Sequence, residues 1–141
     1  MTRGGAARTR AVVQSLENIN QLLDKAKRDA DLEYLVVHAE NRSVLVRTSA
    51  IDWIEAKGNY VNVHRGRESS LVRKSLSALQ AELDPRRFVR IHRSAIVNVD
   101  RIRELERMFH GEYRVILQSG AQLTLSRHYR RAFQKLVGGT L

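Results

Sequence analysis

Apolar residues near the N-terminus recur with the spacing of an α-helix. Between residues 11 and 31 they are separated by alternating steps of four and three positions, which places them along one side of a helix. Thr9 can act as its N-cap. The pattern is shorter than a sustained coiled coil, so two interpretations stay open: the helix packs on its own domain, or it pairs weakly with a second copy. This apolar seam consists of Val12, Leu16, Ile19, Leu23, Ala26 and Ala30.

After Leu32 the pattern changes to short runs that are rich in β-branched and aromatic residues. Turn residues such as Lys57-Gly58-Asn59 and Ser119-Gly120 separate them. The connections are too short to hold crossover helices, so the spacing predicts antiparallel sheets rather than βαβ units. The ten predicted strands cover residues 34–39, 44–48, 51–56, 60–64, 69–73, 88–91, 95–98, 102–106, 112–117 and 122–126.

Two short helices are predicted within and after the strand region. Leucines at helical spacing predict a helix near residues 74–83, and the Asp84-Pro85 pair ends it. A C-terminal helix follows Ser126, which can cap it, and ends at Gly138-Gly139. The apolar face of this last helix consists of Tyr129, Phe133, Leu136 and Val137.

These elements together predict a mainly β fold built from small antiparallel sheets. The chain has 141 residues, enough for one ordinary domain and an appendage. We expect residues 1–31 to form an amphipathic helix and a linker, and residues 32–138 to form one domain.

The charged residues are distributed unevenly along the chain. The chain carries 25 Lys and Arg against 15 Asp and Glu, a net charge of +10. Residues 71–141 hold 14 of the cations and six of the anions, so +8 of the excess lies in that half. A localised cationic excess indicates a polyanionic partner, with nucleic acid as the first candidate.

The sequence lacks the residues that several classes of function require. The chain has no cysteine, and its five histidines stand apart on different predicted elements, so we expect neither disulfides nor a metal site. A glycine-rich phosphate loop and a G-x-S-x-G elbow are absent from the sequence, so we expect no enzyme and no cofactor. No apolar run approaches the roughly 20 residues that span a bilayer, and we expect a cytoplasmic protein without membrane contact.

Three basic or amide-bearing segments stand at the ends of predicted strands. They are residues 57–60, 90–94 and 126–131. Side chains at strand ends can project from a rigid sheet toward a partner. Asn and Arg can pair bidentately with adenine and guanine edges in the major groove, so these segments carry suitable donors for DNA.

The same region carries a family resemblance in three stretches: IDWIEAKGNYV (51–61), FVRIHRSAIVN (88–98) and LTLSRHY (123–129). They resemble, in order, the LytTR DNA-binding domain, the output domain of LytR-type and AlgR-type response regulators of bacterial two-component systems. The resemblance covers about residues 32–137. It implies an elongated stack of three small antiparallel sheets with about ten strands, whose loops enter successive major grooves on one face of double-stranded DNA.

The resemblance also implies roles for individual residues. It places Asn59 and Arg127 in major grooves and Arg93 at the intervening backbone and minor groove. Some family members have His in place of Asn59 and Asn in place of Arg93, so their base preference does not transfer. Family members usually carry a receiver or sensor segment ahead of this domain, and 31 residues cannot hold one. We therefore expect either a fragment of a longer regulator or a stand-alone one.

Residues near Asn59, Arg93 and Arg127 are expected to support their contacts with DNA. Strand alternation puts His92 on the opposite face from Arg93, so we expect His92 to orient the loop. The residues expected to position the protein on the phosphate backbone are Lys57, Arg130 and Arg131.

Two other function classes remain as alternatives to a sequence-specific transcriptional regulator. An RNA-binding module fits the composition equally well, but stacking RNA readers expose aromatic residues on a sheet face, and only 6% of this chain is aromatic. A protein-interaction module that dimerises through residues 11–31 would bind polyanions without sequence preference. Selecting bound sequences from a random duplex library separates the three.

Overall fold

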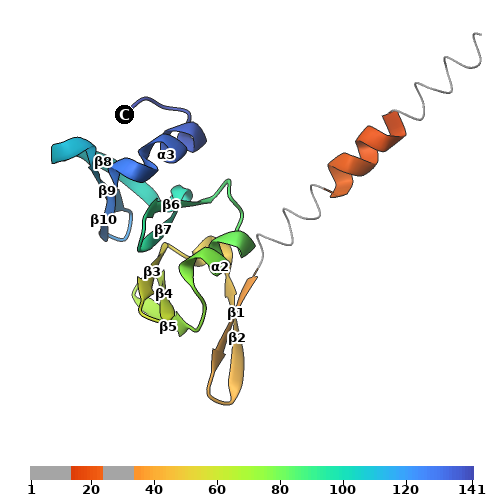
Figure 1. The fold of residues 1–141 in the computed structure, drawn as a ribbon. Helices are drawn as coiled ribbons and strands as arrows, with labels where there is room; N and C mark the ends of the chain where they lie inside the picture. The colour runs from red at the N-terminus through yellow and green to blue at the C-terminus, as the bar shows by residue number, and fades with distance from the viewer. Residues whose placement is uncertain (1–13, 24–33) are drawn as a thin grey trace, which may run out of the picture. The chain divides into compact units, whose positions relative to one another are not determined.

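The computed structural model describes residues 14–23 and 34–141 (Figure 1). Contacts divide the chain into two units, Met1–Asp31 and Leu32–Leu141. In the first unit, residues 14–23 form a helix in which every side chain is exposed. Leu16, Ile19 and Leu23 of the predicted seam are among them, and the remaining seam positions and Thr9 lie outside the described residues. None of the helices described is long and apolar enough to cross a membrane.

Residues 34–141 of the second unit contain ten strands in three antiparallel sheets, which confirms the predicted fold class. A two-stranded sheet consists of β1 (Tyr34–Ala39) and β2 (Arg42–Arg47). A five-stranded sheet has the order β5-β4-β3-β7-β6 and is formed by β3 (Trp53–Lys57), β4 (Tyr60–Arg65), β5 (Glu68–Val72), β6 (Phe88–His92) and β7 (Ala95–Asn98). A three-stranded sheet has the order β10-β9-β8 and is formed by β8 (Ile102–Arg107), β9 (Tyr113–Leu117) and β10 (Gln122–Leu125).

Two helices accompany the sheets. Helix α2 (Leu76–Glu82) begins at Ser75, whose hydroxyl oxygen accepts a hydrogen bond from the N–H of Ala78. Helix α3 (Arg130–Val137) ends at Gly138, which has a φ of 71° and donates its N–H to Gln134 O. Glycine suits this position because other residues are disfavoured in the left-handed region.

The start of the C-terminal helix differs from the prediction. Residues Arg127–Tyr129 form a 3-10 turn before α3, and the side chain of Ser126 makes no capping hydrogen bond. Instead the carbonyl oxygen of Ser126 accepts from the N–H of Tyr129 at 3.0 Å. The predicted apolar face is also narrower than expected, because Phe133 is buried but Val137 remains 40% exposed.

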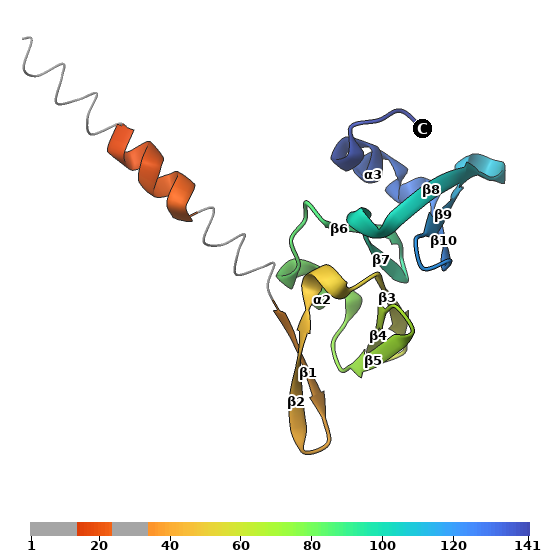
Figure 2. The ribbon, with the colours of Figure 1, turned by 180° about the vertical axis from the view of Figure 1, so that it is seen from behind.

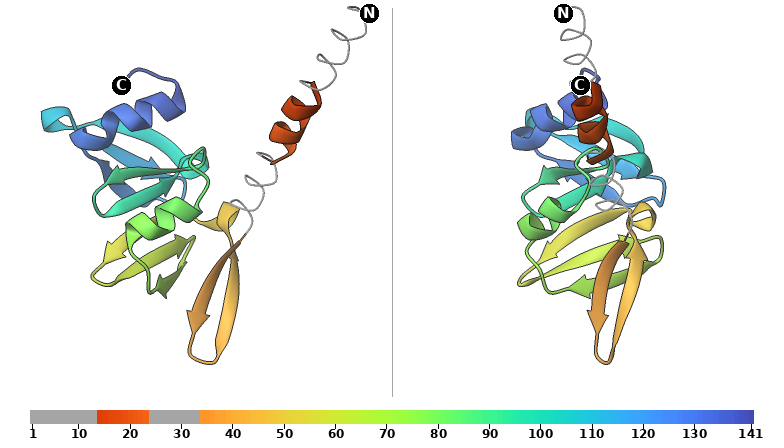
Figure 3. Two further views of the ribbon diagram at one scale, coloured as in Figure 1. Left: turned by 45° about the vertical axis from the view of Figure 1, so that its right-hand side comes forward. Right: turned by 90° about the vertical axis from the view of Figure 1, so that its right-hand side faces the viewer.

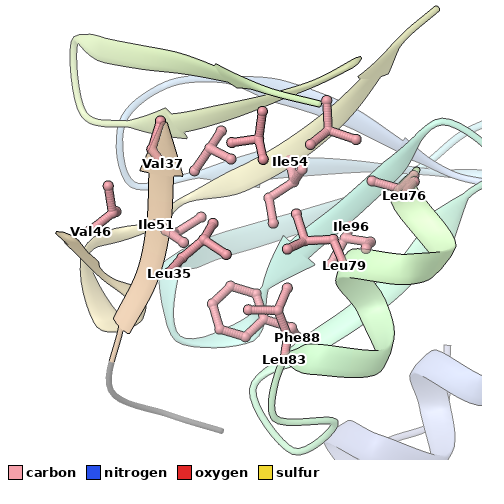
Figure 4. Packing of buried hydrophobic residues seen from close by; sticks show 13 residues of the cluster. Leu35, Val37, Val46, Ile51, Ile54, Leu76, Leu79, Leu83, Phe88 and Ile96 are labelled. Carbon is pink, nitrogen blue, oxygen red and sulfur yellow. The ribbon is translucent and has the colours of Figure 1, made fainter. Parts of the chain in front are cut away.

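The five-stranded sheet is covered on both faces. One face packs with the β1–β2 hairpin and α2 around a first core (Figure 4). The other packs with the three-stranded sheet and α3 around a second core, and α3 contacts β6 (Figure 2). Strand β7 alternates between them: Ile96 enters the first core, while Ala95 and Val97 enter the second. All four β7 residues are therefore buried, which explains why Ala95, Ile96 and Val97 are apolar without alternation.

Asn98, at the end of the FVRIHRSAIVN stretch, has a structural role. Its side chain is buried, its Nδ2 donates to Ile51 O at 2.9 Å, and its Oδ1 accepts from Asp100 N–H at 3.1 Å. Both polar ends of the amide are thus satisfied, as a buried amide requires. The bond to Ile51 O fixes the end of β7 to the segment that precedes β3.

Candidate nucleic-acid interface

The β3–β4 turn presents Asn59 at one end of the five-stranded sheet. Lys57 pairs with Tyr60 in the register, which leaves a two-residue loop of Gly58 and Asn59. Gly58 has a φ of 60°, consistent with the requirement for glycine at the first position of a type II′ hairpin. The side chain of Asn59 is exposed.

The β6–β7 turn lies at the same end of that sheet. Strands β3 and β7 are antiparallel neighbours, with Glu55 opposite Ala95, so the end of β3 meets the start of β7. The N–H of Ala56 donates to Ser94 O at 2.9 Å and ties the two turns together. Arg93, in this second turn, is exposed.

A second backbone hydrogen bond adds the segment after β10. The N–H of Ser126 donates to Ile91 O at 2.8 Å, which places Arg127 beside the end of β6. Arg127 is exposed. The three segments that the sequence singled out therefore lie in a row along one side of the second unit (Figure 3, left). We call the exposed surface of Asn59, Arg93 and Arg127 the turn face.

Arg90 fixes the backbone of the β6–β7 turn through hydrogen bonds. Its Nε donates to His92 O at 2.9 Å, and its Nη2 donates to Arg93 O. Its Nη1 reaches Gln80 Oε1 of α2 at 3.2 Å. Nη1 also lies 3.5 Å from Ser77 Oγ of α2, so a half-buried guanidinium binds two turn carbonyls and two helix side chains, a role that the sequence analysis missed.

His92 is half-buried and points at its own turn. Its Nδ1 lies 2.8 Å from Ser94 Oγ and accepts from Ser94 N–H at 3.2 Å. The ladder between β6 and β7 shifts register between Arg90 and His92. Simple alternation is therefore interrupted at this point, although Arg93 is exposed and His92 is partly covered.

The three residues expected on the phosphate backbone differ in their surroundings. Lys57 is exposed, and its Nζ lies 3.8 Å from Glu55 Oε1. Arg131 is exposed. Arg130 is half-buried: its Nη2 donates to Leu141 O at 2.8 Å, and its Cζ lies 5.4 Å from the centre of the Tyr113 ring. The guanidinium of Arg130 is thus already engaged within the chain.

Two further features adjoin the turn face and were not predicted. Val72, the last residue of β5, pairs with Val61, so the exposed Arg73 lies at the same sheet end as Asn59. The β8–β9 turn brings Phe109, 86% exposed, next to the segment after β10. Arg73 was hidden in a predicted strand, and an apolar residue such as Phe109 suggests a core position in sequence.

The described ranges contain no group of three or more His, Asp or Glu side chains that could hold a metal ion. A shallow depression lies at the turn face and is open to solvent. It is lined by His110, Glu112, Ser126, Arg127 and His128.

Comparison with known proteins gives consistent matches. Residues 41–138 match the LytTr DNA-binding domain family. The chain is 29% identical over 124 residues to the sensory transduction protein LytT of Bacillus anthracis, covering 88% of this chain and 50% of that protein. It is 26% identical over 104 residues to the transcriptional regulatory protein LytR of Staphylococcus aureus strain N315, covering 74% of this chain and 42% of that protein. The chain thus spans half or less of these curated relatives.

A solved structure matches the fold. It is described as the LytTr DNA-binding domain of a methyl-accepting/DNA response regulator from Bacillus cereus. The TM-score is 0.69 at 25% sequence identity, and the match covers 76% of this chain and 98% of that one. The similarity therefore extends over nearly the whole of a DNA-binding domain.

Proposed function

The chain belongs to the LytTr DNA-binding domain family, and from that premise we propose that it binds double-stranded DNA sequence-specifically, in the cytoplasm, as part of a transcriptional regulator. The family is one of DNA-binding domains and not of enzymes. One observation carries the proposal: the hydrogen bonds Ala56 N–H to Ser94 O and Ser126 N–H to Ile91 O set three candidate DNA-contacting turns in a row. Rigid turns held side by side can contact successive parts of a duplex at once.

We assign separate roles to the residues of the turn face. Asn59 and Arg127 read base edges, since their exposed amide and guanidinium can form bidentate pairs. Arg93 contacts the backbone or minor groove. His92 orients its turn, which its two contacts with Ser94 support. Lys57 and Arg131 contact phosphates, whereas the internal bonds of Arg130 leave it less free to do so.

Selection of bound sequences from a random duplex library tests this function. We expect a defined site to be enriched, because two bidentate contacts distinguish bases. Enrichment of no sequence would favour a sequence-blind polyanion binder. Tighter binding to single-stranded RNA than to the selected duplex would favour the RNA-binding alternative, which Tyr60 and Phe109 would serve as exposed aromatic residues.

Affinity for the selected duplex should fall steeply with salt. The turn face and its neighbours expose Lys57, Arg73, Arg93 and Arg131, and each phosphate contact releases counterions. We expect a log–log slope of about −3 in a titration, and Arg131→Ala should make it shallower by about 1. Arg103→Ala is the matched control, because Arg103 is exposed at the opposite end of the three-stranded sheet. A slope shallower than about −2 would contradict the proposal.

We further propose that residues 11–31 mediate a weak homodimer. In the helix of residues 14–23, four apolar side chains are between 51% and 66% exposed: Leu16, Ile19, Leu22 and Leu23. An apolar helix face without cover is stabilised by pairing with a second copy. Two tethered domains would also gain affinity for adjacent DNA sites.

Leu16→Glu should abolish this dimer. Sedimentation of the wild-type protein is expected to show a monomer–dimer equilibrium, and the variant should stay monomeric with the melting temperature of residues 32–138 unchanged. Gln21→Glu, which adds the same charge on the other side of the helix, should still dimerise. A wild-type monomer at high micromolar concentration, or unfolding of the whole chain by Leu16→Glu, would contradict the proposal.

A further inference from the structure

The β8–β9 turn, Met108–Glu112, stands beside Arg127. In the three-stranded sheet, Tyr113 pairs with both Arg107 and Leu125, so the turn and the segment after β10 leave the sheet at the same end. A Cβ added to Gly111 would lie 3.4 Å from Arg127 Cδ. The backbone of this turn is therefore in contact range of the side chain that we assign to base reading.

The turn has a fixed shape. The N–H of Met108 donates to Glu112 O at 2.9 Å, and the N–H of Glu112 donates to Phe109 O at 3.3 Å. His110 and Gly111 both have positive φ, 61° and 76°. A non-glycine residue in the left-handed region is uncommon and persists where its surroundings hold it there. The position of Phe109 is thus set by the turn rather than by contacts of its own ring.

Phe109 projects from this turn into solvent. It is 86% exposed, the highest exposure among the large apolar side chains described. A single exposed apolar residue needs no explanation by itself. Here the residue belongs to a rigid turn whose Gly111 lies close to the Arg127 side chain, with the exposed Arg107 at the base of the turn. An apolar group on a turn that adjoins two arginines suits a polyanion that also offers an apolar surface.

We propose that Phe109 contacts the C5-methyl group of a thymine in the major groove, next to the base that Arg127 reads. This inference rests on the proposed function. A phenyl ring cannot form conventional hydrogen bonds, and the thymine methyl is the apolar group that the major groove presents. The contact adds a preference for thymine at one position, which the hydrogen-bonding residues of the turn face do not supply.

The test uses the duplex selected from the random library, with each thymine replaced in turn by deoxyuridine. Replacement removes only the methyl group. For the wild-type protein, affinity should fall by about fourfold at one position near the Arg127 contact, as expected for loss of one buried methyl-sized group. Phe109→Ala should bind the original duplex roughly tenfold more weakly and be insensitive to that replacement. Phe109→Leu should retain part of the sensitivity.

Leu45→Ala is the matched control. Leu45 is a 63% exposed apolar residue of β2, in the β1–β2 hairpin, which lies apart from the β3–β4 and β6–β7 turns (Figure 3). It should leave both affinity and sensitivity to deoxyuridine unchanged. Because Phe109 is so exposed, Phe109→Ala should melt at the wild-type temperature, which separates a lost contact from lost folding.

Two results would overturn the inference. Phe109→Ala with wild-type affinity would mean that the ring faces solvent in the complex. Loss of affinity without any position sensitive to deoxyuridine would mean that the ring inserts between bases or packs on sugars. Either result leaves the proposed function intact if a site is still selected, whereas failure to select any site would overturn the function itself.

Discussion

Arg127→Ala should erase most of the preference for the selected site while leaving non-specific DNA binding in place. Its guanidinium is exposed and makes no hydrogen bond or ion pair with the described residues, so it is free to bind a base edge. A bidentate pair discriminates by about 1 to 3 kcal/mol, or roughly ten- to a hundredfold in affinity. Competition between the selected duplex and random duplex measures this ratio for each variant.

Two further variants make the result specific. Arg127→Lys keeps the charge but loses the planar fork, so it should bind random DNA normally and the selected site weakly. Arg103→Ala removes an arginine far from the turn face and should keep the full ratio. If Arg127→Ala weakened selected and random duplexes equally, Arg127 would be a phosphate contact.

The strands were predictable because each is a local pattern of β-branched and aromatic residues. The sequence places β1 at residues 34–39 and β7 at 95–98, as the structure does. The pairing order was not predictable. Strand β3 lies between β4, its sequence neighbour, and β7, which is almost 40 residues away. This pairing depends on which faces of the strands the two cores cover. The periodicity of apolar residues along a single strand does not contain that information.

The C-terminal helix shows a different limit of the sequence. Ser126 before a helical pattern predicts an N-cap, but its side chain makes no capping hydrogen bond, and its N–H donates to Ile91 O on another sheet. The chain then makes a 3-10 turn before α3 begins at Arg130. A tertiary hydrogen bond thus accompanies a helix that starts three residues later than an N-cap at Ser126 predicts.

The positions of the candidate DNA-contacting residues were predictable from the sequence, but the hydrogen bonds that fix their turns were not. Asn59, Arg93 and Arg127 follow strand ends, where turn chemistry marks exposed backbone, and all three are exposed. Arg90 gives no such signal, because its binding to two carbonyls depends on the register shift between Arg90 and His92. Its sequence context is only that of one more arginine in a basic segment.

Arg90→Lys should destabilise the domain and weaken specific DNA binding together. A lysine ammonium keeps the charge but cannot reach both turn carbonyls and Gln80 in the planar geometry of a guanidinium. Hydrogen bonds to a charged donor contribute about 1.5 to 3 kcal/mol, so melting should fall on the order of 5 °C or more. Specific affinity should fall roughly tenfold, because a looser turn presents Arg93 in several positions.

Arg93→Ala provides the contrast that identifies the cause. Arg93 is exposed, and its contact with Arg90 uses the backbone carbonyl, which alanine retains. The variant should bind DNA more weakly and melt at the wild-type temperature, as calorimetry would measure. If Arg90→Lys also melted normally while losing affinity, Arg90 would be a direct DNA contact rather than the support of the turn. If Arg90→Lys lowers the melting temperature and Arg93→Ala does not, the Arg90 guanidinium acts on DNA affinity through the geometry of the β6–β7 turn.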